Sequence, residues 1–322
     1  MIHIPAQNIP EVLRQFAAAM NTKVISNTLR IPAAFGSGYC SGYLFGDQIR
    51  LLILNYTLHQ DMVLKNPDSD IHHNMILFKL QHVFPVNTKL QKSPLPTVLI
   101  ATRKVGPDIL MPVHTHTATI NLEINTDYLS GLIASTGQST IIASLLANNQ
   151  PLLFEEAIPP SLPNIVLEIL NAPASDPFHQ YFLRIKAEEI ICHLLMNLEK
   201  RKEKRLQPLN QADIQLVYMV RDKILENLDK PPLLSALASD AAVSTSKLKI
   251  LFKQVFGKPI YNYYQQFRMQ EAARLLKEKG LGVAEVGYQL GFTNMSHFGR
   301  LFEQHIGVKP KNMLHSPKKI LT

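Results

Sequence analysis

The chain has 322 residues and a formal net charge of +8, with 46% hydrophobic and 18% charged residues. At about 150 residues per domain, this length predicts two domains and excludes a single small module. The composition excludes a chain that is disordered for lack of apolar residues. Because the two cysteines, Cys40 and Cys192, lie far apart, a disulfide framework is excluded and a reduced, cytoplasmic location is expected. We expect no signal peptide and no membrane span, since no run of about 18 apolar residues occurs.

The first half of the chain is predicted to be β-rich, after a short helix that begins near Pro10. Runs of β-branched and aromatic residues between turn residues predict strands at Ile49–Leu58, Met75–Phe84, Thr97–Val105 and His114–Ile124. The glycine-rich run 36–42 is predicted to be a hairpin turn, because no helix follows that could hold a phosphate group. Several short strands separated by turns favour an antiparallel barrel or sandwich.

Helical patterns begin at Tyr128, and residues 178–205 predict one long helix. Its apolar positions repeat at intervals of four and three residues, at Leu183, Ala187, Ile190 and Leu194. Further apolar side chains widen this face, so we expect the helix to contact both its own domain and a second copy of the chain. The sequence therefore predicts a homodimer with its interface on this helix.

A basic run at 200–205 predicts the boundary between a first domain, 1–206, and a second domain, 207–322. The charge is divided unevenly between them, because residues 208–322 hold 16 Lys and Arg against nine Asp and Glu. Nearly all of the positive excess therefore lies in the last third of the chain. This asymmetry favours a polyanionic partner, and nucleic acid rather than a membrane surface.

The basic third contains an internal repeat of about fifty residues. Leu251, Phe252, Gln254 and Gly257 recur as Leu301, Phe302, Gln304 and Gly307, whereas residues upstream of them recur at a shift of 49. Each copy is predicted to be a helix-turn-helix, at about 233–256 and about 283–306, with one residue added in the second turn.

The residue types around each predicted turn suit this motif. Gly291 can adopt the positive φ of such a turn without strain, and Ala242 is a weaker substitute at the same place. Ala238 and Gly287 are small enough to let two helices cross closely. Ser244 and Asn294 are predicted to cap the second helices.

The second helix of each copy is amphipathic, and its two faces are expected to have different roles. The buried face is predicted to contain Leu248, Leu251, Phe252 and Val255 in the first copy, and Phe298, Leu301, Phe302 and His305 in the second. The exposed, DNA-contacting face is predicted to contain Ser246, Lys249, Ile250 and Lys253 in the first copy, and Met295, Ser296, His297, Gly299 and Arg300 in the second. Polar and basic groups on a second helix are what reading of the major groove requires.

One helix, 260–279, is predicted between the copies and is closed by Gly280. At 1.5 Å per residue it would span about 30 Å, close to the roughly 34 Å turn of B-DNA. A strut of this length could place two recognition helices in successive major grooves on one side of the duplex.

Residues 213–315 resemble the DNA-binding domain of the AraC/XylS family of bacterial transcription regulators. The resemblance is carried by LASDAAVSTSKLKILFKQVFG, by FRMQEAARLL and by VAEVGYQLGFTNMSHFGRLFEQHIGVKP. Departures from the family pattern are Ala242 in place of Gly, Ile250 in place of Arg and Glu303 in place of Lys. The resemblance implies a sequence-specific regulator of transcription that is not an enzyme, with a cupin-like first domain for sensing and dimerisation. It also implies a small-molecule effector and, for an activator, RNA polymerase as a partner.

His114 and His116 leave a second hypothesis open, a cupin-type metal-binding enzyme or metal sensor fused to a DNA-binding tail. In a strand, however, both histidines would share the apolar face with Ile120 while Glu123 points to the other side. The obvious carboxylate could then not join the two imidazoles on one ion. We therefore expect no metal site, no cofactor and no catalytic residue, and interpret the histidines as inward-facing groups that hydrogen-bond or line a ligand site.

Overall fold

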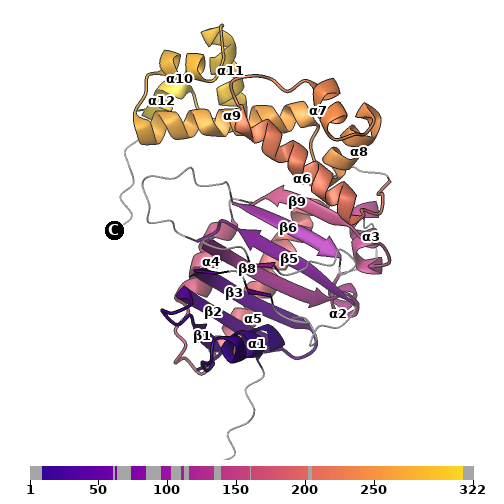
Figure 1. Ribbon diagram of the computed structural model, residues 1–322, viewed down its shortest axis with the longest axis vertical. Coiled ribbons are helices and arrows are strands. Elements are labelled where there is room, and N and C mark those ends of the chain that lie inside the picture. The colour runs from indigo at the N-terminus through magenta and orange to yellow at the C-terminus, as the bar shows by residue number, and fades with distance from the viewer. Residues whose placement is uncertain are drawn as a thin grey trace, which may run out of the picture. The chain divides into compact units, whose positions relative to one another are not determined.

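The structure is a computed structural model that describes residues 9–60, 62–63, 74–84, 96–102, 110–111, 116–133, 139–159, 161–201 and 205–314. The chain divides into two compact units, Met1–Asn210 and Gln211–Thr322 (Figure 1). Among the described residues, no helix is both long enough and apolar enough to cross a membrane.

The first unit is built on an antiparallel sheet that has seven strands in the described residues, in the order β1-β2-β3-β8-β5-β6-β9 (Figure 1). These strands are β1 (Thr28–Arg30), β2 (Gly36–Phe45), β3 (Ile49–Leu58), β5 (Met75–Gln81), β6 (Thr97–Thr102), β8 (His116–Asn125) and β9 (Leu153–Ala157). A second pairing joins β4 (Met62–Val63) to β7 (Leu110–Met111). The prediction of a β-rich N-terminal unit is confirmed, and the four predicted strands correspond to β3, β5, β6 and β8.

One face of the sheet is apolar and packs against helices from the second half of the unit. These helices are α2 (Thr126–Leu132), α3 (Thr140–Ala147), α4 (Leu162–Asn171) and α5 (His179–Leu198). Side chains at alternate strand positions, such as Phe78 and Leu122, are completely buried in this core. On the other face, α1 (Glu11–Ala19) packs against β1, β2 and β3, where Phe16 meets the ring of Tyr56 at 5.9 Å.

The predicted hairpin turn at 36–42 is wrong, because these residues form the first part of strand β2. Gly38 pairs with Tyr56 of β3 and adopts a φ of +104°. A Cβ at Gly38 would lie 2.2 Å from the carbonyl oxygen of Asn55. Glycine is therefore required at this position because two paired strands approach closely. In the sequence, a glycine-rich strand of this kind cannot be distinguished from a glycine-rich turn.

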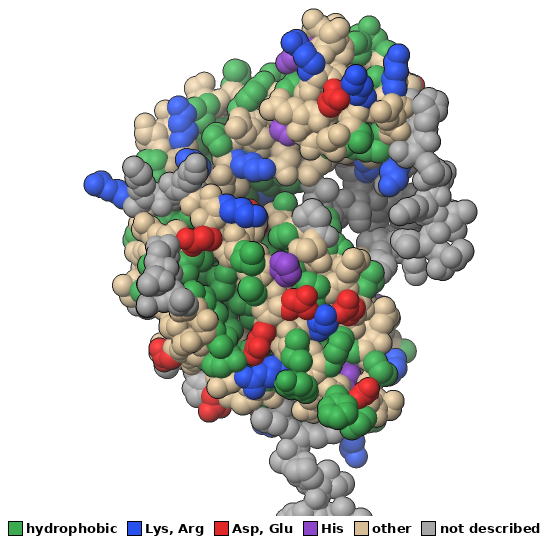
Figure 2. Space-filling view, turned by 180° about the vertical axis from the view of Figure 1, so that it is seen from behind, with side chains coloured by type: hydrophobic (Ala, Val, Ile, Leu, Met, Phe, Trp, Pro, Cys, Tyr) green, Lys and Arg blue, Asp and Glu red, His purple; other side chains and the backbone are tan. Residues whose placement is uncertain are grey.

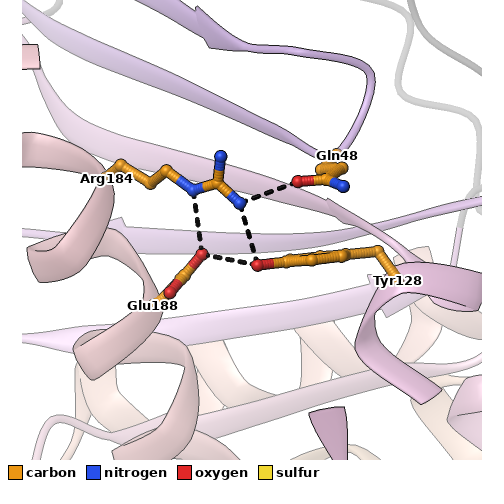
Figure 3. A network of polar contacts seen from close by, with 4 residues as sticks. All are labelled: Gln48, Tyr128, Arg184 and Glu188. Atoms are coloured by element: carbon orange, nitrogen blue, oxygen red, sulfur yellow. Dashed lines mark hydrogen bonds and ion pairs between the residues drawn. The ribbon is translucent and has the colours of Figure 1, made fainter. Parts of the chain in front are cut away.

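Helix α5 is held on the sheet by a polar network (Figure 3). The Arg184 guanidinium donates to the Gln48 side chain at 2.7 Å, to the Tyr128 hydroxyl at 2.9 Å and to the Glu188 carboxylate at 3.1 Å. The Tyr128 hydroxyl also donates to Glu188 at 2.8 Å. Four residues from the β2–β3 turn, α2 and α5 are thereby joined, which fixes the helix over the sheet.

The predicted dimer seam on this helix needs correction. The residues chosen for it, Leu183, Ala187, Ile190 and Leu194, are at most 1% exposed and belong to the core of their own unit. The sheet offers a wide apolar face, and the heptad-spaced stripe of α5 covers that face. The helix also ends at Leu198 rather than continuing to Arg205.

The second unit is helical in its described part. It contains α6 (Gln211–Glu226), α7 (Leu234–Asp240), α8 (Thr245–Phe256), α9 (Ile260–Arg274), α10 (Val283–Gln289), α11 (Met295–Ile306) and α12 (Pro310–Leu314). Helix α9 continues into a π-helical turn, Leu275–Lys279, and ends at Gly280 with a φ of +65°. The predicted long helix between the two copies is confirmed, and it packs against both α8 and α11.

Candidate nucleic-acid interface

The two helix-turn-helix copies of the second unit follow the predicted repeat closely. Helices α8 and α11 have 12 residues each, and their first residues, Thr245 and Met295, are 50 positions apart. Helices α7 and α10 have seven residues each and begin 49 positions apart. The additional residue of the second copy therefore lies in its turn, as predicted.

Both turns use the predicted chemistry. Ala242 adopts a φ of +51° and Gly291 a φ of +75° at corresponding places. The Ser244 side chain accepts a hydrogen bond from the Lys247 backbone N–H at 3.2 Å, and the Asn294 side chain accepts one from the His297 backbone N–H at 3.0 Å. Each of these caps satisfies a donor at the start of a second helix that would otherwise lack a partner.

In the first copy, α8 presents the two faces expected from its sequence. Leu248, Leu251, Phe252 and Val255 are all at most 2% exposed. The predicted contact residues Ser246, Lys249, Ile250 and Lys253 are all exposed. Ile250 is 50% exposed, so its side chain is not packed into the core against the long helix.

The second copy is more mixed. Phe298 and Phe302 are completely buried, whereas Ser296, His297 and Arg300 are exposed. The remaining predicted contact residues, Met295 and Gly299, are half-buried.

Met295 packs against the core of the second copy. Its sulfur lies so near Gly287 that a Cβ at position 287 would be only 2.6 Å away. Glycine at 287 therefore makes room for this side chain. His305 is exposed, so the expectation that it points inward is wrong.

The exposed faces of α8 and α11 carry cations that are available to a partner. Lys249, Lys253 and Arg300 form no ion pair within the described part of the chain, whereas Lys247 pairs with Asp213 at 2.9 Å. In Figure 2, Lys and Arg side chains outnumber acidic ones on the visible surface of the second unit. The arrangement fits a polyanion such as a nucleic-acid backbone.

A positioning residue that the sequence did not reveal is Arg268 of α9. The residue is 5% exposed, and its guanidinium donates twice to the Leu290 carbonyl, at 2.9 Å from Nε, and lies 3.7 Å from the centre of the Phe292 ring. Burial lowers the pKa of Arg268. The residue attaches the turn of the second copy to the long helix, and no periodic signal distinguishes such an arginine from a solvated one.

The metal hypothesis gains no support from the described residues, in which no group of three or more His, Cys, Asp and Glu side chains could hold an ion. His114 lies outside the described residues, and only the backbone of His116, paired with Thr57, is described. The expected strand parity holds further along β8, where Ile120 is in the core and Glu123 is on the opposite face with Arg50.

Comparison with known proteins places residues 237–316 in a helix-turn-helix domain family. The chain is 25% identical over 168 residues to the arabinose operon regulatory protein of Escherichia coli, covering 52% of this chain and 56% of that protein. It is 32% identical over 72 residues to the regulatory protein PchR of Pseudomonas aeruginosa, covering 22% and 24% of the two chains. The C-terminal domain of AraT, a response regulator from Geobacillus stearothermophilus, is 26% identical, with coverage of 31% and 83% and a TM-score of 0.29.

The matched region spans about half or less of each of the two curated relatives. Within that region, the family match, the two capped turns and the exposed basic helices define a helix-turn-helix DNA-binding domain. The resemblance of this region to the DNA-binding domain of the AraC/XylS family is confirmed.

Proposed function

We propose that the protein is a sequence-specific, DNA-binding regulator of transcription and not an enzyme. The observation that carries this proposal is the pair of matched helix-turn-helix copies, whose recognition helices α8 and α11 expose cations that form no ion pair with any described residue. Both helices pack on α9, so α8 and α11 can enter two successive major grooves of a single duplex. The metal-binding enzyme alternative is not favoured, since the relatives are named as regulators.

The experiment is a DNA-binding titration of the full chain at several salt concentrations. The logarithm of the affinity should fall with the logarithm of the salt concentration, at a slope near 0.9 per phosphate contacted. Replacing Lys249, Lys253 and Arg300 by Gln should lower the magnitude of this slope by about 2.7 if all three contact phosphates. Replacing three exposed cations outside the second unit's helices, Lys23, Lys200 and Arg205, should leave the slope unchanged. A salt-independent affinity would contradict the proposal.

The proposed functional protein is a homodimer formed through the first unit. The support is a set of exposed apolar side chains on the outer side of α5, namely Phe178, Tyr181, Ile185 and Met196, exposed by 70%, 65%, 44% and 61%. On this side of the first unit, Figure 2 shows hydrophobic side chains mixed with charged ones. Ile185→Glu should give folded monomers in analytical sedimentation. Gln180→Glu, which adds the same charge at an exposed position on a different face of the helix, is the matched control and should remain dimeric.

The first unit is proposed to sense a small-molecule effector, and RNA polymerase is the proposed further partner if the protein activates transcription. The two-unit division supports a separate sensing role, because the basic recognition helices lie entirely in the second unit. Residues 1–206 are the proposed sensing and dimerising domain, and 207–322 the proposed DNA-binding domain. Genome-wide mapping of bound DNA, with transcript levels measured in a deletion strain, would show whether target genes rise or fall.

A further inference from the structure

The sheet of the first unit has a polar face opposite its apolar core. Along β8, Ile120, Leu122 and Ile124 lie in the core, so Thr119, Asn121 and Glu123 lie on the other face. The neighbouring strand β5 alternates in the same way, with Phe78 and Leu80 in the core and Lys79 on the polar face. Asn121 pairs with Lys79 across the two strands.

Two ionic groups on this face already form an ion pair with each other. Arg50 of β3 lies opposite Glu123 in the register, and Arg50 Nη1 donates to the Glu123 carboxylate at 3.2 Å. Both side chains are largely buried, with exposed fractions of 3% and 11%. A buried cation paired in this way has little charge left for a ligand.

The three side chains Lys79, Thr119 and Asn121, called the Lys79 cluster below, are not satisfied in this way. Thr119 is 7% exposed, and neither its hydroxyl oxygen nor the Asn121 side-chain oxygen has a hydrogen-bond partner. Lys79 forms no ion pair with any described residue. Burial lowers the pKa of Lys79.

An unsatisfied buried polar group costs stability, and a half-buried cation without a counter-charge, such as Lys79, adds to that cost. A protein retains such groups where they are satisfied by something that it binds. The cluster is also flanked by apolar side chains. Leu99 of β6 lies opposite Lys79, and Leu77 is two positions along β5; both are half-buried.

We infer that the Lys79 cluster binds the carboxylate of a small organic acid whose apolar body lies against Leu77 and Leu99. This inference rests on the proposed effector response and names the chemical class of the effector. One unpaired ammonium group matches one negative charge, which favours a carboxylate over a phosphate dianion. The same ammonium repels metal ions, and a neutral ligand would leave it unpaired. Thr119 and Asn121 supply the short-range hydrogen bonds that orient the acid.

Benzoate and hexanoate contain both parts of this ligand class, and benzamide and hexanamide are their neutral counterparts. The thermal unfolding of the full chain should shift upward with either acid, by about 3 °C or more at ten times its dissociation constant, and not with the amides. Lys79→Met should abolish this shift. Lys23→Met, which removes an exposed lysine of the same unit, should retain it.

Two further measurements guard against a variant that merely misfolds. Lys79→Met should unfold at a temperature equal to or above that of the wild type in the absence of ligand, because it removes a half-buried charge that pairs with no described residue. Thr119→Val keeps the shape of the side chain and should bind benzoate several-fold more weakly, as one hydrogen bond to a charged group is lost.

The inference is overturned if neither acid shifts the unfolding temperature, if acids and amides act alike, or if Lys79→Met responds as the wild type does. DNA affinity measured without carboxylates separates this result from a failure of the proposed function. It should be equal in the wild type and Lys79→Met. Absence of DNA binding in the wild type would instead refute the regulator.

Discussion

The two helix-turn-helix copies share helix lengths and caps but differ in how their turns are supported. The first turn has an exposed Ala242 at the positive-φ position, whereas the second has Gly291, where a Cβ would meet the carbonyl of Asp229. The second turn is further bound by Arg268 to the long helix α9. The difference shows that one motif can tolerate a left-handed alanine where its turn is open, and requires glycine where another segment packs on the turn.

The two turns therefore predict unequal changes in the free energy of unfolding when Ala and Gly are exchanged. A Cβ at Gly291 would lie 2.0 Å from the Asp229 carbonyl oxygen and would also hold a positive φ. Gly291→Ala should lower the free energy of unfolding by at least about 3 kcal/mol, measured by chemical denaturation. Ala242→Gly is the matched exchange, and should change it by less than about 1 kcal/mol because relief of the backbone strain offsets the added flexibility. Equal effects at the two positions would show that the packing of Asp229 does not decide them.

Arg268 sharpens the comparison, since it supports the second turn from the side of α9. Arg268→Met leaves the buried Leu290 carbonyl without its donor, so we expect a loss of about 2 kcal/mol in the free energy of unfolding. Arg274→Met on the same helix removes the partly exposed ion pair between Arg274 and Glu271, three residues apart. It should lower the free energy of unfolding by less than about 1 kcal/mol. If Arg268→Met is as mild as the control, the guanidinium does not hold the turn.

The caps test what the copies have in common. Ser244→Ala and Asn294→Ala each remove one side-chain acceptor at the start of a recognition helix. Each should cost about 1 kcal/mol, because both caps make one hydrogen bond of similar length. Thr245→Ala and Ser296→Ala, one or two positions further on, do not remove a cap and serve as controls. A several-fold difference between the two cap variants would mean that the copies fold with unequal dependence on their N-termini.

The sequence was sufficient for features that depend on local chemistry. Local residues determine the strand period of two, the caps at Ser244 and Asn294 and the positive φ at Gly291. The 50-residue repeat is visible when two segments of the sequence are compared. Features that depend on distant segments were not predictable. The glycines of β2 predicted a turn but lie in a strand. The apolar stripe of α5 predicted a dimer interface but covers the sheet of its own unit.

Buried polar groups were the least predictable. In the sequence, Lys79 has the pattern of a solvent-facing lysine on an amphipathic strand. Arg268 has the pattern of a solvent-facing cation on a basic helix. Lys79 is half-buried and Arg268 is buried because β8 and β5, or α9 and the turn at Leu290, come together although they are far apart in the sequence. A signal was present only for β8, whose odd positions Thr117, Thr119, Asn121 and Glu123 are all polar while its even positions from 118 onward are apolar.

The smallest predicted effect concerns the one apolar side chain among the predicted contact residues of α8. Ile250 is half exposed, so it is free to meet DNA, and its matching group in the major groove is the thymine methyl. Burial of one methyl group is worth about 0.8 kcal/mol, so thymine should be preferred about fourfold at one position of the site. Ile250→Arg should change that preference to guanine, which accepts two hydrogen bonds from a guanidinium. Selection of binding sites from random duplex DNA with both proteins checks this, with Ser246→Ala as a control on the same face. An unchanged selected site would show that α8 lies in the groove with Ile250 turned away from the bases.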